Sequence, residues 1–219
     1  LRAISHDLRT PLTTIYGSCS AILENYDTLT TQQKQTLLSE MQQDSMWLIR
    51  MVENLLSITR IDGKKVQLSK VPTVLEELID TVLIKFHKHY PEQQIDIEIP
   101  DDFISIPMDA MLIEQVLINL LENAVVHAKD MTKLSLTVTI ENNQALFHVY
   151  DNGCGIAPDK LDKLFTGYFD TDQTLVDGKR NNMGIGLSVC SAIIKAHGSD
   201  IFVKNNKDGG ASFYFSLNL

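Results

Sequence analysis

Over the first part of the chain, apolar residues recur every three or four positions, which is the spacing of one face of an α-helix. This stripe runs through residues 4–22, and after the polar turn residues 27–31 the apolar positions resume in a heptad-like rhythm over residues 38–55. The pattern predicts two helices, ending near Tyr26 and Arg60, that fold back on each other as an antiparallel hairpin.

Two amphipathic helices cannot bury the outer parts of their apolar stripes against each other alone. Self-association into a four-helix bundle buries them, so we predict a homodimer through residues 1–61. The pattern is broken at Asp62-Gly63, which we interpret as the start of a linker over residues 62–66. Residues 67–219 then form the second domain.

In the second domain, stretches with strand periodicity alternate with stretches of helical periodicity. Together they predict an α+β chain, whose second domain is an α/β sandwich with helices on one face of a mixed sheet. A polar segment at 157–183 is expected to lack regular structure and to be either a functional lid or a disordered excursion. We expect strands over 66–70, 95–99, 134–140, 146–150, 201–205 and 211–217, and helices over 74–89, 110–127 and 186–197.

Charge and composition exclude several classes of function. The chain of 219 residues has 19 Lys and Arg against 28 Asp and Glu, a net charge of -9, so nucleic acid is not an expected partner. Three cysteines with no close spacing suggest neither a disulfide framework nor a zinc site, which fits a reducing compartment. The longest apolar stretch, 111–121, is interrupted by Glu114 and is too short for a membrane span.

His6 is the first candidate for chemistry. It lies two positions from both Ile4 and Leu8, roughly opposite the apolar stripe, so its imidazole should face solvent. A core or incidental surface histidine is the commoner explanation of a lone His. Two neighbours favour a nucleophile, because Asp7 can hold the Nδ1 proton and leave Nε2 free to attack phosphorus, and Thr10 one turn later could position a water.

A second set of candidates suits a nucleotide. Asn119 and Asn123 lie at i and i+4 on a predicted helix, and amide oxygens are suitable ligands for Mg²⁺. Paired asparagines are more often caps or surface groups, but an interior helix rarely carries two amides without a ligand or a network. Asp151 follows a predicted strand and could accept from an adenine amino group, while Gly153 and Gly155 allow close approach of the backbone.

The residues around His6 match a known motif. SHDLRTPL at residues 5–12 resembles the H box of sensor histidine kinases. The runs NLLENA, DNGCGI, FTGYF, GIGL and GGASF resemble, in order, the N, G1, F and G2 boxes and the closing glycine-rich turn of the ATP-binding domain shared by histidine kinases, gyrase-type topoisomerases and Hsp90-type chaperones; they begin at residues 119, 151, 165, 184 and 209. The resemblance covers essentially the whole chain and implies a Bergerat (GHKL-type) fold.

The resemblance also implies roles for individual residues. It makes His6 the acceptor of the γ-phosphoryl group of ATP, Asp7 a base or orienting group, and Thr10 a residue of the reverse, dephosphorylating reaction. It implies ATP and Mg²⁺ as cofactors, with Asn123 as a metal ligand. The positions that it places around the nucleotide are Asn119, Asn123, His127, Asp151, Gly153, Gly155, Ile156, Phe165, Gly184, Ile185, Gly186, Leu187 and Ser212.

Within the family, residues 107–110 and 115–124 look most like the KdpD-type potassium or turgor sensors. The expected partners are therefore a second copy of the chain and the receiver domain of a KdpE-like response regulator. We expect the chain to be the cytoplasmic portion of a membrane-anchored sensor protein, with no membrane contact of its own.

Three positions depart from the family pattern and keep alternatives open. Val126 stands where most relatives have a Lys or Arg, Asn182 replaces the first glycine of the G2 box, and Ser199 replaces a usual glycine. A degenerate kinase that acts as a phosphatase or as an ATP-binding scaffold is one alternative. A GHKL-type ATPase is the other, although Asn119 stands where such enzymes place the Glu that activates water.

Overall fold

The chain forms two compact units, residues 1–56 (unit 1) and residues 57–219 (unit 2). The computed structural model describes the backbone of residues 2–62, 68–165 and 185–219, and the side chains of residues 8–54, 68–165 and 186–219. The predicted linker at 62–66 lies outside the described residues except for Asp62, the last residue of a helix.

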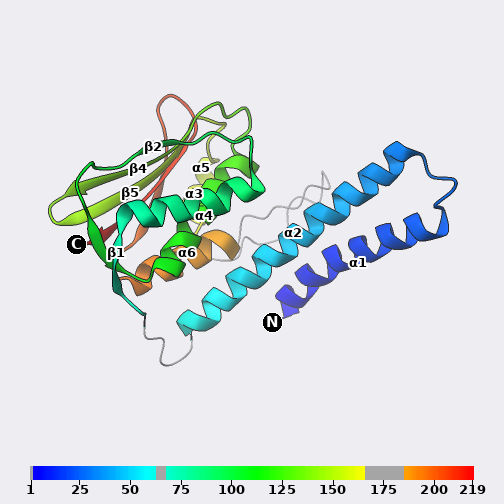
Figure 1. The fold of residues 1–219 in the computed structure, drawn as a ribbon, viewed down its shortest axis with the longest axis horizontal. Coiled ribbons are helices and arrows are strands. Elements are labelled where there is room, and N and C mark those ends of the chain that lie inside the picture. Colours follow the sequence, from blue (N-terminus) through cyan, green and yellow to red (C-terminus); the bar gives the residue numbers. More distant parts are fainter. Residues whose placement is uncertain (1, 63–67, 166–184) are drawn as a thin grey trace. The chain divides into compact units, whose positions relative to one another are not determined.

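Unit 1 contains α1 (Arg2–Glu24) and most of α2 (Thr31–Asp62), which run antiparallel (Figure 1). Helix α1 continues through Pro11, and α2 begins with a capping box. In this box Thr30 Oγ1 accepts from the Gln33 N–H at 3.2 Å, and Gln33 Oε1 accepts from the Thr30 N–H at 2.9 Å. The predicted hairpin is confirmed, with its first helix two residues shorter than expected.

The hairpin leaves much apolar surface uncovered within one chain. Large apolar side chains on both helices are between 48% and 80% exposed, including Leu12, Tyr16, Leu23, Leu38, Ile49 and Val52. Large apolar side chains left exposed along both helices are characteristic of a protein interface.

The main sheet of unit 2 has five strands in the order β2-β4-β5-β7-β6. Strand β2 runs parallel to β4, and the other neighbours are antiparallel, so the predicted mixed sheet is confirmed. Between β4 and β5, Asn142 and Asn143 both have positive φ (49° and 64°), as a two-residue hairpin turn requires. The bounds are β2 (Asp96–Glu98), β4 (Leu134–Glu141), β5 (Gln144–Asp151), β6 (Ile201–Asn205) and β7 (Ala211–Asn218).

Three helices, α3 (Leu75–His89), α4 (Ala110–His127) and α6 (Ile185–Ala196), cover one face of this sheet (Figure 1). The core lies between the two layers, where the buried rings of Phe147 and Phe215 stack 4.9 Å apart. Helix α4 is long and apolar enough to cross a membrane by length and composition. Seven of its apolar residues are buried in this core, which accounts for its apolar character.

A second, two-stranded sheet pairs β1 (Val71–Val74) with β3 (Ser105–Met108). The predicted strand at 66–70 is wrong, because residues 68–70 are not in a strand and β1 begins at Val71. Strand β3 was not expected; here Pro72 lies opposite Pro107 in a sheet where both strands are edges, the position in which a strand tolerates proline. The segment predicted to lack regular structure contains a short helix, α5 (Pro158–Leu161), and its residues 166–183 lie outside the described residues.

A buried histidine ties α6 to the start of α4. His197, 7% exposed, follows α6, and its Nδ1 donates to the Ile193 carbonyl at 2.8 Å. Its Nε2 accepts from the Asp109 N–H at 3.1 Å, where Asp109 caps α4. These two bonds fix the neutral tautomer, and burial lowers the pKa of His197.

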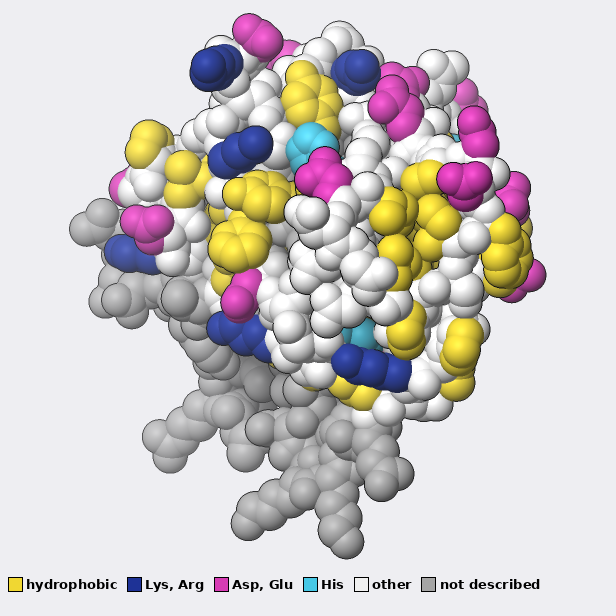
Figure 2. Space-filling view, turned by 90° about the vertical axis from the view of Figure 1, so that its left-hand side faces the viewer, with side chains coloured by type: hydrophobic (Ala, Val, Ile, Leu, Met, Phe, Trp, Pro, Cys, Tyr) yellow, Lys and Arg dark blue, Asp and Glu magenta, His cyan; other side chains and the backbone are white. Residues whose placement is uncertain are grey.

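On the face of the molecule drawn in Figure 2, charged side chains of both signs are interspersed with small groups of hydrophobic side chains. The net charge of the chain is acidic, and the described residues of this face form no single large basic patch.

Candidate nucleotide-binding site

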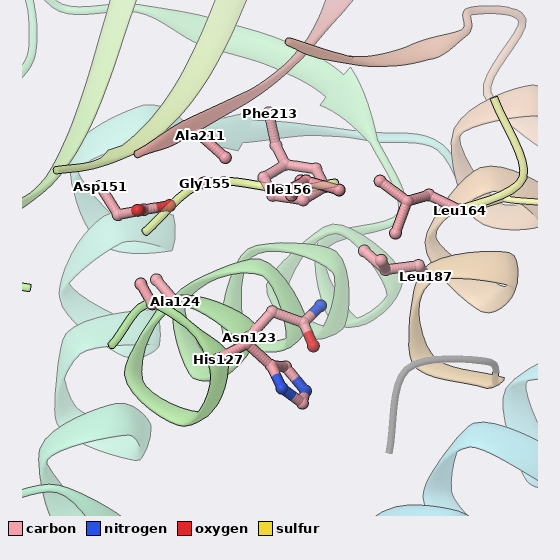
Figure 3. Close-up of a pocket in the computed structure, with 11 residues that line it drawn as sticks. Asn123, Ala124, His127, Asp151, Gly155, Ile156, Leu164, Leu187, Ala211 and Phe213 are labelled. Carbon is pink, nitrogen blue, oxygen red and sulfur yellow. The ribbon is translucent and has the colours of Figure 1, made fainter. Parts of the chain in front are cut away.

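A pocket of about 420 Å³, including the space open to solvent, lies in unit 2 between α4 and the loop that follows β5 (Figure 3). It brings together six of the residues that the sequence predicts around a nucleotide: Asn123, His127, Asp151, Gly155, Ile156 and Leu187. The other lining residues are Ala124, Ala128, Leu164, Ala211 and Phe213. Its wall is therefore mostly apolar with a few polar groups, which is typical of a ligand site.

Asp151 is the acidic group of the pocket. It is the last residue of β5, only 5% exposed, and its Oδ1 accepts from the Gly153 N–H at 2.9 Å. Burial raises the pKa of Asp151, and hydrogen bonds from the Gly153 and Ala211 N–H groups oppose this shift. A fixed carboxyl group in an apolar wall is a suitable acceptor for an amino group of a flat ligand.

Asn123 and His127 come from the opposite wall. They are one turn apart on α4, and Figure 3 shows the amide and the imidazole projecting from the same side of the helix. The buried Nδ2 of Asn123 has no hydrogen-bond partner among the described residues, which is the condition of a group that meets a ligand. Burial also lowers the pKa of His127, so the ring is neutral at neutral pH.

The Asn123 amide also shows whether the residues of the pocket suit Mg²⁺. An amide oxygen at the pocket wall, with its nitrogen unpartnered, is a hard neutral donor of the kind that Mg²⁺ accepts alongside phosphate and water. Groups of three or more His, Cys, Asp or Glu side chains that could hold a metal by themselves are absent from the described part of the chain. Asn123 therefore fits a metal that is shared with a bound phosphate, rather than a site made by the protein alone.

Glycines let the loop after β5 pack closely on its neighbours. A Cβ atom on Gly153 would lie 2.6 Å from the Cβ of Ala128, at the end of α4. At Gly210 (φ 80°) a Cβ atom would lie 2.0 Å from the carbonyl oxygen of Asp151. A side chain at either position would displace the loop that carries Asp151, so glycine is required at both.

Other predicted nucleotide residues lie near the pocket without lining it. Asn119 is half-buried one turn before Asn123, and its side chain hydrogen-bonds the buried thiol of Cys190. The ring of Phe165 packs edge-on against Phe213, 6.4 Å away. The hydroxyl of Ser212 donates to Asn206 Oδ1 at 2.6 Å, so in this structure it is engaged within the protein.

Some predicted site residues can be placed only by their backbone. His6 and Asp7 lie on α1 and Ile185 begins α6, but their side chains are outside the described residues, as is all of Gly184. Thr10 is exposed on α1.

Five lining residues, all apolar, were not predicted as nucleotide residues: Ala124, Ala128, Leu164, Ala211 and Phe213. The alternation of apolar residues along β7 gives Phe213 an inward position, and this signal could have identified it. Asn205 and Asn206 were not predicted either; their side-chain amides bond to Ile156 and Asp151, at the two ends of the loop after β5. Their signal is a pair of asparagines just before the glycine turn at 209–210.

Comparison with known proteins agrees with this geometry. The family model described as "Histidine kinase-, DNA gyrase B-, and HSP90-like ATPase" matches residues 108–219, more than half of the chain and all of the pocket. The chain belongs to this ATPase family. The model of the His Kinase A (phospho-acceptor) domain matches residues 1–64, which include the helical hairpin and His6.

Curated members of the family agree with the predicted resemblance to KdpD-type sensors. The chain is 37% identical over 217 residues to the sensor protein KdpD of Clostridium acetobutylicum, and 33% identical over 219 residues to that of Escherichia coli. Each alignment covers 99% of this chain and 24% of the relative. The chain thus spans about a quarter of the length of these relatives.

Solved structures of histidine kinases share the fold. The complex of histidine kinase ThkA with the response regulator protein TrrA gives a TM-score of 0.71 at 25% identity, over 99% of this chain and 60% of the other. Full-length ShkA in complex with AMPPNP gives 0.65 at 25% identity, over 99% and 44%. Histidine kinase AdeS of Acinetobacter baumannii gives 0.69 at 24% identity, over 97% of both chains. The predicted α+β architecture is therefore confirmed.

Proposed function

We propose that this chain is the catalytic core of a two-component sensor histidine kinase, which transfers the γ-phosphoryl group of ATP to His6 and then to an aspartate of a response regulator. The observation that carries the proposal is a pocket with the buried carboxyl group of Asp151 on one wall and the side chain of Asn123 on the other. The amide nitrogen of Asn123 has no hydrogen-bond partner among the described residues. The match of separate family models to the hairpin and to the pocket unit supports it.

The two walls of the pocket suit the two ends of ATP. Asp151 would accept a hydrogen bond from the adenine amino group, and the apolar side chains of Ile156, Leu187 and Phe213 would contact the base. The Asn123 side chain would bind at the phosphate end, where its amide nitrogen can donate to a phosphate oxygen. Among the family members with known structure, the ShkA complex contains AMPPNP, which is consistent with this role.

Mg²⁺ would be held by the amide oxygen of Asn123, and when bound it would offset the charge of the phosphate oxygens. The phosphorus of the terminal phosphate would be attacked by the lone pair of Nε2 of His6, forming a P–N bond as the bond to the β–γ bridging oxygen breaks and ADP leaves. Asp7 would hold the Nδ1 proton and so favour the attacking tautomer. Thr10, exposed on α1, would position a water for the dephosphorylating reaction.

His6 and the pocket belong to different units, so turnover requires the two units to approach each other. We propose residues 1–61 as the dimerisation and phosphoacceptor domain, 62–66 as the linker, and 67–219 as the ATP-binding domain. The exposed apolar side chains of the hairpin support a homodimer, in which a four-helix bundle covers them.

The partner would be the receiver domain of a response regulator, as in the complex of ThkA with TrrA. The similarity to KdpD sensors favours a KdpE-like regulator. It also favours a place for this chain in the cytoplasmic portion of a membrane-anchored sensor.

Incubation with γ-labelled ATP and Mg²⁺ tests the proposal. The account expects label on the protein that is lost in acid and retained in alkali, as a phosphoramidate bond requires. Release of label only as free phosphate would instead indicate a GHKL-type ATPase. If the label appears neither on the protein nor as free phosphate, the chain would be an ATP-binding scaffold.

The site assignment needs a matched pair of variants. His6→Gln should abolish labelling, whereas His148→Gln, on the sheet face opposite the helices, should label as the unmodified chain does. Label that persists in His6→Gln would refute the assignment of His6.

A further inference from the structure

Two adjacent asparagines at the end of β6 bind the two ends of the loop at residues 151–156. Asn205 Oδ1 accepts from the Ile156 N–H at 2.8 Å, and Asn205 Nδ2 donates to the Ile156 carbonyl at 2.6 Å. Asn206 Nδ2 donates to the Asp151 carbonyl at 3.1 Å. Ile156 and Asp151 are the last and first residues of the loop, so each asparagine holds one end.

Asn205 makes with Ile156 the two hydrogen bonds that the backbone of a paired strand would otherwise make. Both backbone groups of Ile156 are satisfied by one amide, an arrangement that fixes position and direction together. The loop lies so close that a Cβ atom on Gly155 would be 3.1 Å from Asn205 Oδ1, and Gly155 has a φ of 71°. The loop is therefore shaped to fit against this amide.

The orientation of the second amide is also determined. Asn206 Oδ1 accepts the Ser212 hydroxyl at 2.6 Å, which leaves Nδ2 for the Asp151 carbonyl. Gly210 approaches the same carbonyl so closely that a Cβ atom there would lie 2.0 Å from the oxygen. The backbone of Asp151 is thus held by a side chain that does not line the pocket.

This loop supplies Asp151, Gly155 and Ile156 to the pocket, opposite the wall formed by α4. We propose that Asn205 and Asn206 are positioning residues, which set the separation of the two pocket walls and the place of the Asp151 carboxyl group without touching the nucleotide. The inference rests on the proposed binding of ATP in this pocket.

We expect the fold to survive the loss of the Asn205 bonds. Asn205 is exposed at the end of a strand, and Ile156, which it holds, is only partly buried and packs against the edge of the hydrophobic core. Loss of its amide should free the loop while the sheet and helices stay folded. A loosened loop must be ordered again when a nucleotide binds, so the cost appears in affinity.

Asn205→Ala tests the proposal, with Asn218→Ala as the matched control. Asn218 is also an exposed asparagine in this sheet, and its Oδ1 accepts from Gln144 Nε2 at 2.9 Å. In the free protein, Asn205→Ala should speed amide hydrogen exchange at Ile156, while Asn218→Ala should not. The dissociation constant for Mg·ATP and the KM for ATP should rise about ten-fold, as expected for two lost hydrogen bonds, with kcat within about two-fold.

The results of these experiments distinguish the positioning role from a loss of stability and from failure of the proposed function. The split between KM and kcat separates positioning from instability, because a partly unfolded variant would lose active protein and so kcat. Unchanged affinity in Asn205→Ala, or equal losses in both variants, would overturn the inference and leave the proposed function intact. If the unmodified chain did not bind Mg·ATP, the proposed function and the positioning role would both be refuted, while Ile156 exchange would still report whether the amide holds the loop.

Discussion

Replacement of Asp151 by asparagine should separate stability from nucleotide binding. Asp151 is 5% exposed, and burial raises the pKa of its carboxyl group. The neutral form is therefore more favoured in the folded protein than in the unfolded chain. The contribution of the carboxyl group to stability is therefore greatest below the unfolded value of 3.8 and is lost as the pH rises through the folded pKa. At neutral pH the ionised group lowers the free energy of unfolding, and Asp151→Asn removes this cost.

The structure also indicates that the substitution preserves the loop. An asparagine oxygen can still accept from the Gly153 N–H, now 2.9 Å from Oδ1, and the side chain keeps its volume. The acceptor for an adenine amino group is weakened from charged to neutral. A hydrogen bond to a charged group contributes about 1.5–3 kcal/mol and one to a neutral group about 0.5–1.5 kcal/mol, so the loss of about 1–1.5 kcal/mol should lower the affinity for Mg·ATP about 5- to 13-fold.

Calorimetric titration with Mg·ATP and urea unfolding at neutral and acid pH would measure both effects. Asp151→Asn should be at least as stable as the unmodified chain at neutral pH, with the difference closing as the pH falls. The exposed Asp200, changed to asparagine, provides the control for loss of one charge. Unchanged affinity, or a loss of stability at neutral pH that matches the loss of binding, would refute the reasoning.

Three further changes have expected outcomes. Gly153→Ala should place a Cβ atom 2.6 Å from that of Ala128, so thermal unfolding should show a loss of about 1–3 kcal/mol and nucleotide affinity should fall; an unchanged melting temperature would contradict this. Because burial lowers the pKa of His197 from 6.5, its contribution is complete above about 6.5 and is lost as the pH falls through the folded pKa. Urea unfolding should therefore show less stability at acid pH, and a weaker pH dependence in His197→Gln; equal slopes would show that this ring is not responsible. Phe147→Ala should remove a buried ring that stacks on Phe215 and lower the free energy of unfolding by about 3–5 kcal/mol, and a loss under 1 kcal/mol would mean that the core refills the space.

The sequence predicted the parts of the fold with strong periodicity or turn chemistry. The hairpin of α1 and α2, the long helix α4 and the β4–β5 turn at 142–143 were all expected. Strand β3 was missed, because a four-residue strand with Pro107 has too few residues for alternation to be recognised. The short strand predicted at 66–70 failed for the same reason, since a few apolar residues fit several structures.

The candidate site was partly predictable. Asp151 and Asn123 could be found because their chemistry and motif spacing are local, and the pocket brings them together. The roles of Asn205 and Asn206 could not, because their partners lie about 50 residues earlier in the chain and a side-chain bond to a backbone leaves no periodic pattern. The bond from the Ser212 hydroxyl to Asn206 is local, six residues apart, but it joins two side chains across the glycine turn and also leaves no periodic pattern.

The central claim is that a nucleotide enters the pocket between α4 and the loop after β5. Titration of Mg·ATP into isotope-labelled protein, followed by the backbone amide signals, tests this most directly. The account predicts saturable shifts concentrated at residues 151–156 and around Asn123. Signals that stay in place there while ATP is in large excess, or shifts confined to other parts of unit 2, would contradict it.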